Sequence, residues 1–131
     1  MKIYLPPAFS KQAVKDDISD RSLSEAVARA NRGQVDAQLG AFLIKQRVAR
    51  LGQGRSGGHR VILAYKRGDV AVPLYTFSKN QKANLTKNEL EAFRDYADQL
   101  AKHTDEQFSR LVNERGWRQI DDEQPEEDVP K

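Results

Sequence analysis

The sequence predicts an α+β domain, in which an antiparallel β-sheet carries two helices from the N-terminal part and one helix from the C-terminal part. Three observations support this fold class. The segment patterns along the 131 residues follow the order strand, two helices, three strands, helix. Capping-box pairs precede helical segments, and the middle of the chain alternates with a period of two. The length suits one hydrophobic core, and we expect the helices to pack on one face of the sheet.

The N-terminal part predicts one strand and two helices. Lys2–Leu5 alternates as a short strand, and the two prolines that follow end it. A short helix is expected over Ser10–Ile18, with Ser10 as its N-cap. Ser22 and Glu25 form a capping-box pattern for a second helix, and Gly33 is expected to end it.

The middle of the chain predicts three consecutive strands. Apolar residues alternate with polar ones through Phe42–Ala49, and the strand patterns of His59–Lys66 and Val70–Ser78 follow. Because the connections are short, the strands should form an antiparallel meander. The glycine-rich segment Gly52–Gly58 reads as a loop. Pro73 lacks a backbone donor, so we expect an edge position or a bulge there.

The C-terminal part predicts an amphipathic helix and a second short one. Thr86 and Glu89 form a capping box, and apolar residues recur at helical spacing until His103. Thr104 and Gln107 are the corresponding pair for a further short helix. We expect a folded domain over residues 1–118 and an acidic, disordered tail over 119–131.

The charge is distributed unevenly. The net charge is +3, but residues 119–131 hold six acids and one lysine, so residues 1–118 carry +8. From Leu39 to Gly68 there is no acid, while seven bases fall there: Lys45, Arg47, Arg50, Arg55, Arg60, Lys66 and Arg67. Such a field attracts polyanions, of which nucleic acid is the commonest. The alternative is a solvated basic surface without a ligand.

Several bases lie where neighbouring strands could bring them together. Lys45 and Arg47 are two residues apart, so their side chains leave the same face of a strand. Arg60 lies on the next strand, and Lys79 and Lys82 follow the third. The sequence is therefore compatible with one basic patch built from three strands.

Other kinds of chemistry find little support. The chain has no cysteine, which excludes disulfides and thiol catalysis. Between Asp36 and Glu89 the only acid is Asp69, so we expect no metal site and no cofactor. Of the two histidines, His103 is expected to meet the end of a helix, whereas His59 adjoins Arg60 and could carry a proton.

Nothing in the sequence points to a membrane. The N-terminal segment is interrupted by prolines before it could form the apolar core of a signal peptide. No apolar run approaches the roughly 20 residues that a membrane span needs. We therefore expect a cytoplasmic protein with no membrane partner.

Two central segments resemble the RelE/ParE superfamily of type II toxin–antitoxin toxins. They are Gly54–Ile62, which reads GRSGGHRVI, and Leu74–Leu85, which reads LYTFSKNQKANL. The resemblance extends over Leu39–Leu100 and is nearest to the HigB-like, phage-derived RelE branch. It implies a compact sheet with helices against it, and a toxin that a co-expressed antitoxin blocks, expected to be a helix-turn-helix protein. In RelE-like members the activity is cleavage of mRNA in the ribosomal A site.

The resemblance also implies roles for single residues. Lys45 and Arg47 match the basic pair before the loop, Arg60 matches the arginine of the Gly-Gly-x-Arg motif, and Lys82 matches the arginine after the last central strand. The sequence departs from the family at three places. His59 replaces an aromatic residue, Gln81-Lys82 replaces Glu-Arg, and Thr86 falls near a catalytic tyrosine of some members.

We interpret the chain as a ribosome-dependent, metal-independent endoribonuclease that acts on mRNA. Its expected catalytic residues are Arg60, Lys45, His59 and Lys82, and its expected RNA-binding residues are Arg47, Arg50, Arg55 and Lys79. Two alternatives stay open. One is a growth inhibitor of the ParE type that binds DNA gyrase, because fold alone does not fix the target. The other is a basic nucleic-acid-binding module that is not toxic.

Overall fold

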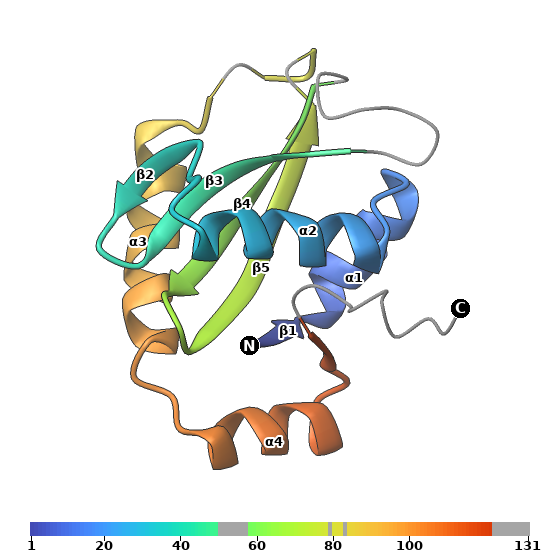
Figure 1. Cartoon of the computed structure of the whole chain (residues 1–131), viewed down its shortest axis with the longest axis vertical. Helices are drawn as coiled ribbons and strands as arrows, with labels where there is room; N and C mark the ends of the chain where they lie inside the picture. The colour runs from blue at the N-terminus through green and yellow to red at the C-terminus, as the bar shows by residue number, and fades with distance from the viewer. Residues whose placement is uncertain (50–57, 79, 83, 122–131) are drawn as a thin grey trace.

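A computed structural model describes residues 1–49, 58–78, 80–82 and 84–121 of the chain (Figure 1). Six strands and four helices occur in these residues: β1 (Lys2–Leu5), α1 (Pro7–Lys15), α2 (Asp20–Asn31), β2 (Ala37–Gly40), β3 (Leu43–Val48), β4 (His59–Lys66), β5 (Val70–Ser78), α3 (Lys87–Leu100), α4 (Asp105–Glu114) and β6 (Arg118–Asp121). The α+β fold class predicted from the sequence is confirmed.

The six strands form one sheet in the order β2-β3-β4-β5-β1-β6. The predicted antiparallel meander of β3, β4 and β5 is confirmed, since β4 pairs antiparallel with β3 from Leu43↔Ala64 to Val48↔His59 and with β5 from His59↔Ser78 to Lys66↔Val70. The strand β1 lies beside β5 and runs parallel to it. The short strand β2 pairs with β3 and was not predicted, because its four residues, AQLG, carry no strand pattern.

The helices cover both faces of the sheet, so the expectation of one covered face was wrong. In Figure 1, α2 crosses one face of the central strands and α3 stands on the other. The reason is that the central strands are apolar on both faces. In β4, Val61 and Leu63 belong to the core under α1 and α2, whereas Ile62 and Ala64 belong to the core under α3. Both faces therefore need a covering layer.

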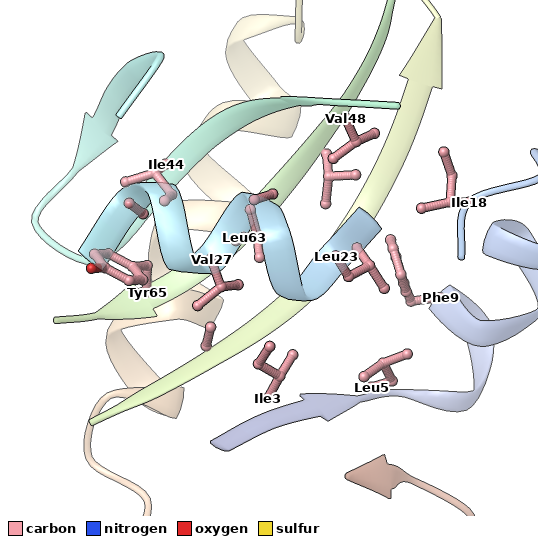
Figure 2. Close-up of a cluster of buried hydrophobic side chains, with 14 of the residues drawn as sticks. Ile3, Leu5, Phe9, Ile18, Leu23, Val27, Ile44, Val48, Leu63 and Tyr65 are labelled. Atoms are coloured by element: carbon pink, nitrogen blue, oxygen red, sulfur yellow. The ribbon is translucent and has the colours of Figure 1, made fainter. Parts of the chain in front are cut away.

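Figure 2 shows the core between the sheet and the two N-terminal helices. Leu23 and Val27 of α2 and Phe9 of α1 point toward Leu63 and Val48 on the strands. These side chains are at most 1% exposed. This face of the sheet is closed to solvent at its centre by close apolar packing.

The two N-terminal helices begin at other residues than expected. The helix α1 begins at Pro7, because a proline in the first turn gives up no intrahelical hydrogen bond, and Ser10 lies inside it. The N-cap of α2 is Ser19, whose hydroxyl accepts a hydrogen bond from the backbone N–H of Ser22 at 3.0 Å. The predicted end of α2 at Gly33 is confirmed, since Gly33 has a φ of 85°.

The C-terminal helices and the irregular strand agree with the sequence analysis. Capping boxes start both helices, with Thr86 and Glu89 at α3 and Thr104 and Gln107 at α4. In β5 the register shifts where Ile62 pairs with Tyr75 and Leu63 pairs with Pro73, so the bulge expected near Pro73 is confirmed. Leu74 therefore has no partner in β4, as in a bulge.

The sheet extends past the expected start of the tail. Arg118–Asp121 form β6, which pairs with β1 in an antiparallel register from Leu5↔Arg118 to Lys2↔Asp121. The expected tail therefore does not begin at Gln119. Its polar sequence predicted disorder, but a short exposed edge strand needs only backbone partners, and β1 supplies them.

Candidate nucleic-acid interface

Three predicted basic residues lie together on the α3 face of the sheet. Lys45 pairs with Ile62, and Arg47 pairs with Arg60, across β3 and β4. Cross-strand partners share a face, and Ile62 belongs to the core under α3. Lys45, Arg47 and Arg60 thus lie on the α3 face, as the period-two reading predicted.

Arg47 and Arg60 form a like-charge pair directly opposite each other across β3 and β4. Directly opposite residues in an antiparallel pair have Cβ atoms about 4.5–5.5 Å apart, and like charges there are destabilising. The Nη1 of Arg60 is buried and meets no hydrogen-bond acceptor within the described ranges. A buried guanidinium nitrogen without an acceptor is costly. An anion near the exposed Arg47 guanidinium would reduce the repulsion between the two arginines.

Arg47 is held in place by α2 and by the residue before β2. Its backbone N–H donates to Oδ2 of Asp36 at 2.6 Å, and its Nη2 lies 3.6 Å from Oδ1 of the same carboxylate. The buried Arg29 of α2 donates to the Arg47 carbonyl and lies 3.5 Å from Asp36. Burial alone would raise the pKa of Asp36, but the hydrogen bond from Arg47 and the two guanidinium charges outweigh it and lower that pKa.

Lys45 contacts the segment that joins β5 to α3, and Lys82, which belongs to that segment, contacts α3. The Lys45 ammonium donates to Oδ1 of Asn84 at 3.2 Å. The Lys82 ammonium donates to both carboxylate oxygens of Glu89, at 2.7 and 2.8 Å. The bond from Glu89 raises the pKa of Lys82, and the bond from Lys82 lowers the pKa of Glu89. Lys82 is therefore a permanent cation at neutral pH and a poor proton carrier.

Stacked aromatic side chains lie beside these bases. Tyr75 stacks on Phe77 and on Phe93 of α3, with ring centroids 5.8 Å apart in both pairs. The Lys82 ammonium lies 5.6 Å from the centre of the Tyr75 ring. The half-buried Tyr75 was not among the predicted site residues. The alternation of side chains could have identified Tyr75, because Tyr75 pairs with Ile62 and so lies on the same face as Arg60.

His59 does not join the basic residues. It is adjacent to Arg60 in β4, so its side chain leaves the opposite face of the sheet. There it is 4% exposed, and its Nε2 lies 3.5 Å from Oδ2 of Asp16, next to the end of α1. The expectation that His59 and Arg60 act at one site therefore disagrees with the geometry. The other histidine, His103, packs against Phe108 with ring centroids 5.2 Å apart.

Three predicted RNA-binding residues, Arg50, Arg55 and Lys79, lie outside the described residues. Within the described ranges, no three side chains of the metal-ligating types lie close enough to hold an ion together. None of the four described helices has the length and apolar character required to cross a bilayer.

Comparison with known proteins assigns the family. The family model described as the RelE toxin of the RelE / RelB toxin-antitoxin system matches residues 1–120. No curated protein shows a significant match. The family match covers every described strand and helix apart from the last residue of β6. The chain belongs to the RelE toxin family, whose members pair with an antitoxin.

Proposed function

We propose that this toxin inhibits translation as a ribosome-dependent mRNA endonuclease of the HigB-like branch. The observation that carries the proposal is the opposed pair of Arg47 and Arg60 on the α3 face. Lys45 lies next to that pair along β3, and Lys82 lies at the margin, beside the ring of Tyr75. These side chains come from three segments of the chain and suit a phosphodiester backbone.

The proposed reaction is attack by a ribose 2′-oxygen on the adjacent phosphorus. The bond from phosphorus to the 5′-oxygen breaks, and the proton lost by the 2′-hydroxyl is returned through solvent to the leaving 5′-oxygen. The pentavalent phosphate gains negative charge on the way. Arg60 can offer it two parallel N–H donors, and Lys45 a point charge. Arg47 and Lys82 hold the flanking backbone. No metal ion is required for this distribution of charge.

The proton chemistry supports dependence on the ribosome. Neither histidine lies among the basic residues, because His59 faces the other side of the sheet and His103 packs against Phe108 after the end of α3. The raised pKa of Lys82 makes it an ineffective acid and base near neutrality. Such a site supplies charge stabilisation but little proton transfer. It would cleave free RNA slowly, and a ribosome that holds the mRNA in a reactive geometry would supply the missing positioning.

The test is Arg60→Ala in a purified translation system, with cleavage of the programmed mRNA mapped by primer extension. Loss of one such transition-state contact costs about 2.7–4 kcal/mol, so cleavage should slow about a hundred- to a thousandfold. Arg60→Lys should recover only part of the rate, because lysine lacks the bidentate fork. Arg110→Ala, an exposed arginine on α4, is the matched control and should cleave at the normal rate.

The melting temperature of each variant separates the explanations. Arg60→Ala should melt within a few degrees of the unaltered protein. A folded Arg60→Ala variant with full activity would contradict the site assignment. If cells stop growing while their mRNA stays intact and DNA supercoiling changes, the target is gyrase and the proposal fails.

A further inference from the structure

The second half of β5 has an edge without a strand neighbour. Along its other side β5 pairs with β4 from Val70 to Ser78, but β1 pairs with β5 only at Val70 and Ala71. After Leu5 the chain leaves the sheet and turns into α1. In the described part of the chain, no strand therefore covers the outer edge of β5 from Val72 to Ser78.

Two glutamine side chains accept hydrogen bonds from backbone N–H groups of this edge. The backbone N–H of Thr76 donates to Oε1 of Gln12 on α1 at 3.0 Å, and the N–H of Ser78 donates to Oε1 of Gln81 at 3.0 Å. Donors two residues apart point to the same side of a strand. A glutamine amide has the same carbonyl group as a peptide bond. Each glutamine thus stands where the C=O of an added strand would lie.

An open, basic groove runs along this edge. It has a volume of about 520 Å³ and is lined by residues of α1, of β5 and of the turn after β5. Lys11 and Lys15 are both exposed, lie one helical turn apart on α1, and form no ion pair with a described residue. The half-buried Tyr75 adds aromatic surface, and the buried Phe77 lies behind it. Asp16 also lines the groove, but its carboxylate faces His59.

We propose that the edge of β5 binds an extended, acidic segment of a protein partner by strand addition. The backbone carbonyls of the segment would replace Gln12 and Gln81 at the N–H groups of Thr76 and Ser78. Its acidic side chains would face Lys11 and Lys15. This arrangement favours a peptide over RNA, because two N–H donors at the two-residue repeat match the carbonyl repeat of a strand. The proposal goes beyond RNA cleavage and does not depend on it.

The experiment uses the full chain and a fluorescent heptapeptide of alternating glutamate and valine, with binding followed by polarisation. A matched lysine–valine peptide is the charge control. Two further acidic peptides carry N-methyl groups on alternate backbone nitrogens, on one edge or on the other. We expect the acidic peptide to bind, the lysine peptide to bind at least about tenfold more weakly, and only one of the two methylated peptides to bind.

Variants of the protein give the sharpest readout. Gln12→Ala with Gln81→Ala removes the competing carbonyls, so the acidic peptide should bind about three- to tenfold more tightly. Lys11→Glu with Lys15→Glu should weaken it about tenfold, whereas Lys102→Glu, an exposed lysine after α3, should change nothing. Melting curves without peptide show whether each variant is folded.

Three outcomes would overturn the proposal. Binding that tolerates both methylated peptides would exclude backbone pairing. Weaker binding to the folded glutamine variant would mean that the glutamines themselves contact the ligand. Tighter binding of a uridine dodecamer than of the acidic peptide, lost in the Lys11→Glu and Lys15→Glu variant, would identify the groove as an RNA surface.

Discussion

The two faces of the sheet are built from the same strands but present different chemistry. On the α1/α2 face, apolar side chains continue to the end of β3 and β4, and the polar residues that occur there are buried. On the other face, Arg47 near the end of β3 is exposed, so α3 does not cover this end of the strand. The reach of the covering helix therefore decides which face keeps charged groups accessible.

The neighbours Gln46 and Arg47 show this difference at single-residue scale. Gln46 is fully buried under α2, donates to the carbonyls of Ala26 and Gln34, and accepts from the backbone N–H of Asp36. Arg47, one residue later, has a side chain that is 49% exposed. The Gln46 amide on the closed face is fully hydrogen-bonded, whereas the exposed Arg47 on the open face keeps donors available for a ligand.

The largest expected effect concerns the closed face. Leu63 is fully buried under α2 (Figure 2), so Leu63→Ala should lower the free energy of unfolding by about 2–5 kcal/mol. Urea denaturation measures this. Cleavage by the fraction that stays folded should be normal, because Leu63 points away from the basic residues. A folded variant that has lost cleavage would show that the two faces are not separable.

The second prediction concerns the carboxylate that joins the two faces. Asp36→Asn should destabilise the protein by about 1–2 kcal/mol at pH 7, because the hydrogen bonds from Arg47 and Arg29 lose their charge. The folded pKa of Asp36 lies below its ordinary value of 3.8. Its stabilisation is thus present above that value and disappears as the pH falls through the folded pKa. Denaturation of both proteins between pH 7 and pH 3 should give converging stabilities, and a constant difference would contradict this account.

A third prediction uses two capping boxes of the same type. Thr86→Ala and Thr104→Ala each remove the N-cap of a helix and should each cost about 1 kcal/mol in thermal denaturation. Only Thr86 belongs to the box whose glutamate also holds Lys82. Thr86→Ala should therefore slow mRNA cleavage severalfold and Thr104→Ala should not. If both variants cleave mRNA at the same rate, the N-cap of α3 does not influence the basic surface.

The smallest effect is expected at His59. Because its side chain is buried on the closed face, His59→Phe should cleave mRNA within about twofold of the normal rate and change stability by about 1 kcal/mol or less. Primer extension measures the cleavage rate, and thermal melting measures the stability. If cleavage falls by orders of magnitude while melting is unchanged, His59 carries a proton after all.

Much of the fold was predictable because it depends on local patterns. The period of two identified β3, β4 and β5, and the capping boxes identified α3 and α4. The strands β2 and β6 were missed because their residues carry no such pattern, and only pairing with β3 and β1 makes them strands. The covering of both faces was also missed, because each helix shows an apolar stripe but not which side of the sheet it meets.

The candidate site was predictable to the same extent. Alternation placed Lys45, Arg47 and Arg60 on one face correctly. It also implied that His59 lies on the other face, but its sequence position beside Arg60 suggested a joint role. Asp36 was not recognised as a contact of Arg47, because it lies eleven residues away in the sequence and meets it only after β2 folds back on β3.

The pairing of β1 with β6 places the two ends of the folded sheet side by side. Lys2 is opposite Asp121, so a pull on the chain at these two ends would load the pair at one end and open it bond by bond. A parallel arrangement of the same strands would instead have to break all the bonds at once. After β6 has peeled away, β1 is held in the sheet only at Val70 and Ala71. Unfolding by a pull between these two ends would therefore begin at the β1–β6 pair.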